Sequence, residues 1–215
     1  MFAVQNTWEA GIEGVRIDLR EWLRKMSEDD SGYVPWRFEL AFGLSGRRKR
    51  DPHSRLEPVE LDAGMKLRGS IDLVERDGSG RLRVTDHKTG SVRYKQGEVI
   101  AGGKMLQPVF YALAVEKLVR EAEVTEGRLS YCTVNGGFEI RSVPLDVAAR
   151  DAAKAVAEAV GKAVDEGFLP ALPAPRACEF CDYALVCGPY EELRTRRKPP
   201  NRSSLETLQR LREMP

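Results

Sequence analysis

The amino-acid sequence predicts an α/β domain with a mixed β-sheet. Three observations lead to this fold class: amphipathic helical patterns at both ends of the core, five short segments of alternating or turn-bounded apolar residues, and a further helical pattern between the third and fourth of them. The 215 residues are 42% hydrophobic and 31% charged, which suits a globular chain with a sizeable core.

The first elements are a helix and a strand. Apolar residues recur at helical spacing over residues 4–26, which predicts an amphipathic helix. Residues 35–44 are predicted to be a strand, with Phe38, Leu40 and Phe42 sharing one face because side chains alternate along a strand.

A β-hairpin is predicted over residues 66–75 and 81–88, joined by a turn rich in glycine. Such a hairpin would bring Asp72 and Asp86 close together. Lys88 lies two residues beyond Asp86 and therefore points to the same side of an extended strand.

The remaining elements alternate between helix and strand. A loop over residues 90–103 leads to a helix over 104–121. A second hairpin, 127–134 and 138–143, is built around an Asn-Gly-Gly turn. An alanine-rich helix over 145–166 completes the predicted core.

The paired carboxylates and the lysine suggest phosphodiester chemistry. A hard divalent cation is held by one or two carboxylates with water, and it neutralises phosphoryl charge while activating a water molecule. Asp72 and Asp86 suit this role, the backbone carbonyl of His87 could be a further oxygen ligand, and Lys88 would stabilise charge on the phosphate. The alternative is a surface hairpin with ordinary charges, since Asp-x-Lys alone is common.

Gln107 and Tyr111 lie four residues apart on one face of the helix over 104–121. Their side chains can hydrogen-bond phosphates or position the lysine. The alternative is a helix-start glutamine and a half-buried tyrosine with structural roles.

In series, these residues resemble the PD-(D/E)XK nuclease superfamily, specifically its RecB-type branch. The resemblance rests on Glu39, Gly69–Asp72, Asp86–Gly90 and Gln107–Tyr111, and it covers about residues 35–190. It implies a restriction-endonuclease-like core with a mixed central sheet flanked by helices. It also implies that Asp72 and Asp86 bind Mg²⁺ or Mn²⁺, that Lys88 is catalytic, and that Gln107 and Tyr111 contact DNA or brace the site. Glu39 would be a metal-site residue or a structural one.

Three cysteines near the C-terminus, Cys178, Cys181 and Cys187, match a C-x2-C-x5-C triplet. This triplet resembles the one in iron–sulfur members of the same branch, such as AddB-type helicase–nuclease subunits. Thiolates at this spacing can ligate a [4Fe–4S] cluster or zinc. Cys132 lies in a predicted strand and is expected to be a core residue. The cluster therefore lacks its expected fourth ligand in this chain.

The sequence departs from that branch in three ways. No cysteine precedes the core, the helix over 4–26 has no histidine, and Leu73 stands where an arginine often follows the aspartate. Either the chain is the C-terminal piece of a longer protein that holds the missing histidine and cysteine, or this homologue has dispensed with them.

The charge and hydropathy of the sequence limit which classes of partner are expected. The formal net charge is only +1, but basic residues cluster at 47–50 and in the last 22 residues. Such clusters can bind the phosphates of a nucleic acid, or they can be solvent-exposed basic segments without a binding role. With no long apolar run and no signal peptide, a cytoplasmic protein without a membrane partner is expected. We divide the chain into a nuclease domain, 1–190, and a basic C-terminal tail, 191–215.

The leading hypothesis is therefore a metal-dependent, exonuclease-type DNA nuclease in repair or recombination. It would act on single strands or duplex ends, with a helicase subunit or domain as a partner implied by the resemblance. One alternative is a DNA-binding module, or an inactive fragment of a larger helicase–nuclease, whose fold is held by an iron–sulfur cluster or zinc. Another is a zinc-bearing scaffold.

Overall fold

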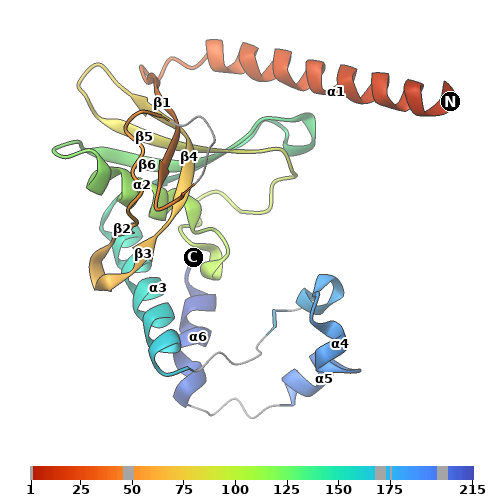
Figure 1. The fold of residues 1–215 in the computed structure, drawn as a ribbon, viewed down its shortest axis with the longest axis vertical. Coiled ribbons are helices and arrows are strands. Elements are labelled where there is room, and N and C mark those ends of the chain that lie inside the picture. The colour runs from red at the N-terminus through yellow and green to blue at the C-terminus, as the bar shows by residue number, and fades with distance from the viewer. Residues whose placement is uncertain (1, 46–50, 168–172, 175, 198–202) are drawn as a thin grey trace.

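The structure, a computed structural model, describes residues 2–45, 51–167, 173–174, 176–197 and 203–215. Figure 1 shows a central sheet, a long N-terminal helix that projects from it, and two helices that run side by side below it. Residues 46–50, 168–172, 175 and 198–202 lie outside the described residues, and so the whole predicted basic cluster at 47–50 does too.

The central sheet has five strands: β1 (Val34–Phe42), β4 (Gly69–Arg76), β5 (Leu82–Lys88), β6 (Val124–Tyr131) and β7 (Ile140–Pro144). Their order is β1-β4-β5-β6-β7, and every neighbouring pair is antiparallel except β5 and β6, which run parallel. A parallel pair needs a long crossover, and helix α2 (Gln107–Leu118) supplies it. The predicted fold class, a mixed sheet flanked by helices, is confirmed.

A two-stranded ribbon, β2 (Val59–Glu60) and β3 (Lys66–Leu67), stands beside the main sheet. The second of these segments was expected to be the start of the hairpin, and the first was not expected to be a strand. Strands of two residues carry too little periodicity to be seen in a sequence.

Helix α2 covers one face of the sheet over β5 and β6, and α3 (Val147–Asp165) packs beside it. The buried core is mostly aliphatic, and Val84, Val109 and Val156 are among its members. Helix α3 begins where Asp146 accepts a hydrogen bond from the Ala149 N–H, an N-cap that satisfies one free helix donor.

Gly127 of β6 lets α2 approach the sheet closely. A Cβ built on this glycine would lie 1.9 Å from the Pro108 carbonyl oxygen, a distance that no side chain can occupy. The first turn of α2, which carries Gln107, is therefore set against β6 by backbone contact rather than by interlocking side chains.

The opposite face of the sheet carries a buried ionic network. Glu75 of β4 accepts hydrogen bonds from Arg83 of β5 at 2.7 and 3.1 Å and from Arg128 of β6 at 2.9 and 3.0 Å. Thr85 donates to the same carboxylate at 2.6 Å, and Asp29 pairs with Arg83 at 3.1 Å. Burial alone would raise the pKa of Glu75, but these hydrogen bonds and charges hold it below its usual range.

The predicted face of β1 is wrong in part. Phe38 is 59% exposed although it was expected beside Leu40, whereas Ala41 is fully buried. The reason is Glu39, whose φ of 50° breaks the alternation of the strand. A register shift between Pro35 and Arg37 bends the same strand.

Helix α1 (Phe2–Ser27) contacts the sheet near its C-terminal end and leaves several large apolar side chains exposed, Trp8 among them at 70%. Trp22 packs edge-on against the His87 ring, and Asp18 accepts a hydrogen bond from the Val134 N–H at 2.8 Å. The helix thus ends beside the last residues of β5.

The segment after α3 is helical where the sequence analysis predicted only a cysteine segment and a basic tail. It contains α4 (Ala184–Cys187), α5 (Glu191–Arg196) and α6 (Ser203–Glu213), and α6 runs beside α3 (Figure 1). The Met214 carbonyl accepts a hydrogen bond from Gly102 N–H at 2.9 Å. The end of the chain is therefore attached to the loop before α2.

No helix among the described residues combines the length and the apolar character needed to cross a membrane.

Candidate active site

The β4–β5 hairpin brings the two predicted aspartates to the same place. Leu73 pairs with Thr85 and Val74 pairs with Val84, and continuing that register places Asp72 opposite Asp86. The turn at the other end of the hairpin is fixed by Asp77. Although burial opposes the shift, hydrogen bonds from Ser79 and Arg81 lower the pKa of the Asp77 carboxyl to about 2.

Asp86, Lys88 and Gln107 form one connected group. The Gln107 side chain donates from Nε2 to Asp86 Oδ1 at 3.0 Å and accepts at Oε1 from Lys88 Nζ at 2.7 Å. Lys88 Nζ also lies 2.5 Å from Asp86 Oδ2 as an ion pair. Oδ2 is buried and forms no hydrogen bond with the described residues, so the ion pair with Lys88 is the contact that compensates its charge.

Asp72 faces Asp86 from the neighbouring strand and remains about one-third exposed. Its Oδ2 accepts a hydrogen bond from the His87 N–H at 2.7 Å. The His87 ring lies on the Trp22 side, with Nδ1 3.8 Å from Asp72 Oδ2. Burial lowers the pKa of His87 more than the two aspartates raise it, which favours the neutral ring.

Burial raises the pKa of Asp86, and the neighbouring charge of Asp72 adds to this, whereas Lys88 opposes it. A buried carboxylate oxygen without a hydrogen bond, beside a second carboxylate, suits a divalent cation. Within the described part of the chain, no group of three or more His, Cys, Asp or Glu side chains is arranged to hold a metal ion. Carbonyl, water or substrate oxygens would have to complete such a site.

Glu39 and Tyr111 stand at the edge of this group. In the β1–β4 register, Glu39 falls opposite Asp72, but its exposed carboxylate accepts a hydrogen bond from Ser70 Oγ at 3.1 Å instead. Tyr111 packs edge-on against Phe42, and a Cβ at Gly69 would lie 3.0 Å from its ring. The glycine of the Gly-x-x-Asp segment therefore makes room for Tyr111, which makes no described contact with the aspartates.

The cysteine triplet lies in and just before α4, which Figure 1 draws apart from the sheet. Burial and the nearby charges of Glu191 and Glu192 raise the pKa of the Cys178 thiol, and Cys181 and Cys187 are near enough to add to this effect. All of these thiols are free, and the last two are exposed. Cys132, expected in the core, is half-buried, and its thiol donates to the Lys88 carbonyl at 3.4 Å.

A cavity of about 480 Å³ opens beside Lys88 and Gln107, between the end of β5, the loop before α2 and the first turn of α2. The charged side chains that line it are Lys88, Arg93 and Lys104, and no Asp or Glu of the described residues does so. Arg93 and Lys104 were not predicted from the sequence, because single basic residues in an irregular loop carry no periodic signal.

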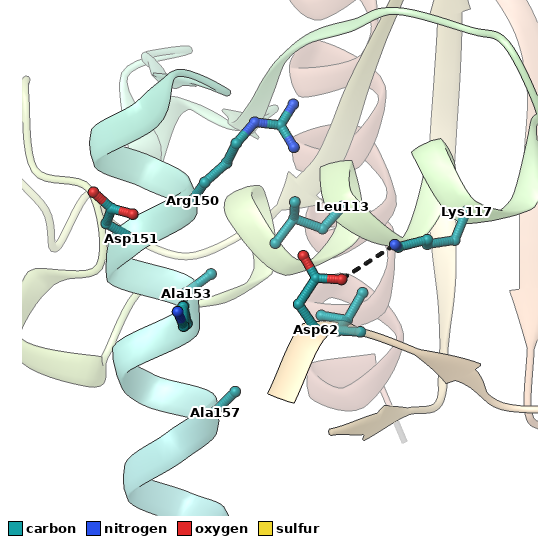
Figure 2. Close-up of a pocket in the computed structure, with 9 residues that line it drawn as sticks. Asp62, Leu113, Lys117, Arg150, Asp151, Ala153 and Ala157 are labelled. Atoms are coloured by element: carbon teal, nitrogen blue, oxygen red, sulfur yellow. Dashed lines mark hydrogen bonds and ion pairs between the residues drawn. The ribbon is translucent and has the colours of Figure 1, made fainter. Parts of the chain in front are cut away.

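A smaller hollow of about 170 Å³ lies between α2, α3 and the turn at Asp62. Figure 2 shows Asp62 reaching Lys117 across this hollow, with Arg150 and Asp151 on the α3 side. Acidic and basic side chains are mixed here, and none of the predicted site residues lines it. The two cavities therefore differ in charge.

The comparison with protein-family models matches residues 4–188 to the PD-(D/E)XK nuclease superfamily. The chain belongs to the PD-(D/E)XK nuclease superfamily. No curated protein matches the chain significantly. Membership implies nuclease activity with DNA as the substrate class, and nucleases of this superfamily typically use divalent metal ions. The RecB-type branch within the superfamily stays a prediction.

Proposed function

We propose that this PD-(D/E)XK protein is a Mg²⁺- or Mn²⁺-dependent deoxyribonuclease whose site is built on Asp72, Asp86 and Lys88. The observation that supports this most directly is the buried Asp86 Oδ2, which lacks a hydrogen bond within the described residues and faces a second carboxylate. In the structure Lys88 is the cation that pairs with this buried oxygen. A divalent cation held by both carboxylates would take over that pairing and free Lys88 for the phosphate.

Each residue has a defined task in this proposal. When bound, a divalent cation supplies charge neutralisation at the phosphoryl group and lowers the pKa of a water molecule. Asp72 is oriented for binding by the His87 N–H, and Asp86 by the Gln107 amide. Lys88, held by the other end of the same amide, donates to a phosphate oxygen or to the attacking water.

The supporting residues are assigned from their positions. We propose Glu39 and the His87 backbone carbonyl as further oxygen ligands, since Glu39 falls opposite Asp72 in the strand register. Tyr111 braces the start of β4 through its contact with Gly69. These assignments rest on the resemblance to the RecB-type branch as well as on the geometry.

The same resemblance supports a role in DNA repair or recombination, with exonuclease-type action at single strands or duplex ends and with a helicase partner. It also supports a [4Fe–4S] cluster or zinc on Cys178, Cys181 and Cys187. In the structure the described side chains of these cysteines are not gathered into a metal-binding group, so this assignment rests on their spacing in the sequence. Elemental analysis of iron and zinc, with the visible absorbance of the purified protein, tests this assignment.

A DNA-binding module without cleavage is the second candidate function. It is favoured by the Lys88–Asp86 ion pair, because a lysine 2.5 Å from a carboxylate already balances the charge that a metal would balance. In this case the chain binds DNA equally well with and without a divalent cation.

Replacing Asp86 or Lys88 with alanine tests the nuclease proposal. We expect wild-type protein to shorten linear single- or double-stranded DNA in Mg²⁺ or Mn²⁺ but not in EDTA. Each variant should lose at least about 100-fold in rate, the scale of losing a charged group at the reacting centre. The matched control is Asp62→Ala, an exposed carboxylate distant from the site. Cleavage at the wild-type rate by Asp86→Ala or Lys88→Ala would contradict the proposal.

A further inference from the structure

Two loop cations, Arg93 and Lys104, share the cavity that opens at the proposed active site. Both residues are exposed, and neither side chain forms an ion pair within the described part of the chain. Lys88, the other cation in the lining, is already paired with Asp86. The cavity therefore presents two unpaired positive charges in a chain whose net charge is only +1.

The surrounding structure holds these two residues on one wall. Tyr94 follows Arg93, and its hydroxyl donates to the Lys104 carbonyl at 2.8 Å. The Tyr94 carbonyl in turn accepts from Arg141 Nε of β7 at 2.8 Å. The two backbone segments that carry the cations are thus tied to each other and to the sheet, which keeps both side chains rooted at the same wall of the cavity.

Three further features of this cavity favour an anionic strand. No carboxylate of the described residues lines it. Helix α2 begins in its wall at Gln107 with no side chain capping its N-terminus, so its free N–H groups add positive potential. The half-buried ring of Tyr94 offers an aromatic surface beside the cations, a combination that is typical of single-strand nucleic-acid grooves.

We propose that Arg93 and Lys104 bind phosphates of a single nucleic-acid strand next to the phosphodiester held at Asp72 and Asp86. This subsite rests on the proposed nuclease function for its placement. It makes the loop before α2 the surface that guides one strand past Lys88. Arg93 and Lys104 are binding residues, so they set the affinity for the strand rather than the rate of cleavage at saturating DNA.

The test measures binding of the full chain to an oligothymidylate in EDTA, where cleavage is absent, over a series of salt concentrations. Each phosphate contact contributes a slope of about 0.9 to the dependence of log K on log salt, or about 0.7 for single strands. We expect Arg93→Ala and Lys104→Ala to weaken binding about fivefold each and to reduce that slope by about 0.7, the value of one phosphate contact on a single strand. Arg93→Lys and Lys104→Arg, which keep the charge, should keep the slope.

Lys95→Ala is the matched control, because Lys95 is an exposed cation of the same loop that does not line the cavity. The subsite proposal is overturned if Arg93→Ala and Lys104→Ala show the same dependence of log K on log salt as Lys95→Ala. This holds whether or not the wild type cleaves DNA. It stands if the two alanine variants alone lose slope, even in a protein that shows no cleavage with Mg²⁺ or Mn²⁺. That last result would reject the nuclease proposal and keep the subsite.

Discussion

Gln107 joins the proposed catalytic lysine and a proposed metal ligand through the two ends of one amide. Because the amide carries both a donor and an acceptor, it can form hydrogen bonds with Asp86 and Lys88 at the same time. A carboxylate has no donor for Asp86, and a hydrocarbon side chain has neither group. The sequence suggested either phosphate contact or positioning of the lysine for this residue. In the structure it contacts the lysine, so we assign it as a positioning residue.

Replacing Gln107 with leucine should therefore slow DNA cleavage without unfolding the protein. Lys88 and Asp86 would each lose one hydrogen bond and move, and misplacing reacting groups by about 1 Å can cost about 100-fold in rate. Single-turnover cleavage at saturating DNA measures the effect. The affinity for DNA in EDTA should stay within about twofold, since charge–phosphate contacts dominate binding.

Gln96→Leu is the control for this change, as Gln96 is an exposed glutamine in the loop before α2. Equal cleavage by Gln107→Leu and Gln96→Leu would argue against the positioning role.

At the scale of elements, the contact between α2 and β6 sets the position of the site. Lys88 is carried by a strand and Gln107 by a helix, so the distance between their atoms depends on how closely α2 lies on the sheet. Gly127 permits that approach, because any side chain there would meet the Pro108 backbone. The sequence contains this glycine without a local signal of its role, since the contact joins residues 19 positions apart.

Gly127→Ala should destabilise the fold and slow cleavage together. The added Cβ would overlap backbone that cannot rotate away, and overpacking of this kind costs roughly 1–3 kcal/mol. Chemical denaturation measures the change in the free energy of unfolding.

Gly161→Ala makes a useful control, because a Cβ at this α3 position meets no atom within 4 Å. It should instead stabilise the protein by about 0.5–1 kcal/mol, the helix preference of alanine over glycine. A Gly127→Ala protein as stable as wild type would show that α2 can shift freely on the sheet.

For the whole molecule, the buried network around Glu75 joins three central strands and the segment that follows α1. Glu75 is 1% exposed and Arg128 4%, so this network replaces an apolar layer on the face opposite α2. Removing one partner leaves buried charge without compensation, which typically costs about 3–5 kcal/mol. The proposed active site depends on this network indirectly, because β4 and β5 also carry Asp72 and Asp86.

Stability should consequently fall in acid through Glu75. Its folded-state pKa is lowered, so its contribution is fully present above the unfolded-state pKa and is lost as the pH drops through the folded-state value. The free-energy difference between wild type and Glu75→Gln should be largest near neutral pH. It should shrink below about pH 4, where the glutamate of the unfolded chain is protonated.

Urea denaturation at several pH values measures this difference, with Glu60→Gln as an exposed control on β2. A difference that stays constant from neutral to acidic pH would mean that the pKa of Glu75 is the same in the folded and the unfolded chain.

The sequence alone was sufficient for the fold class and for the set of residues gathered at the hairpin, because strand alternation and turn chemistry are local properties. Asp72 and Asp86 meet because antiparallel pairing around a short turn has only one register with the apolar row buried. The face of Phe38, the helical C-terminal segment and the ionic network were not predictable in this way. A positive φ at Glu39, the docking of α6 and the meeting of Glu75 with Arg128 each depend on contacts between distant segments.

What the sequence determined by itself, then, is the order of elements and the presence of two carboxylates and a lysine on one hairpin. The tertiary structure decided that Gln107 joins two of them, that Asp86 Oδ2 is buried without a hydrogen bond, and that Arg93 and Lys104 share a cavity free of carboxylates. The physical reason is that periodicity reports which face of an element is buried. It does not report which residues of other elements lie across from that face, and the chemistry of a site depends on those neighbours.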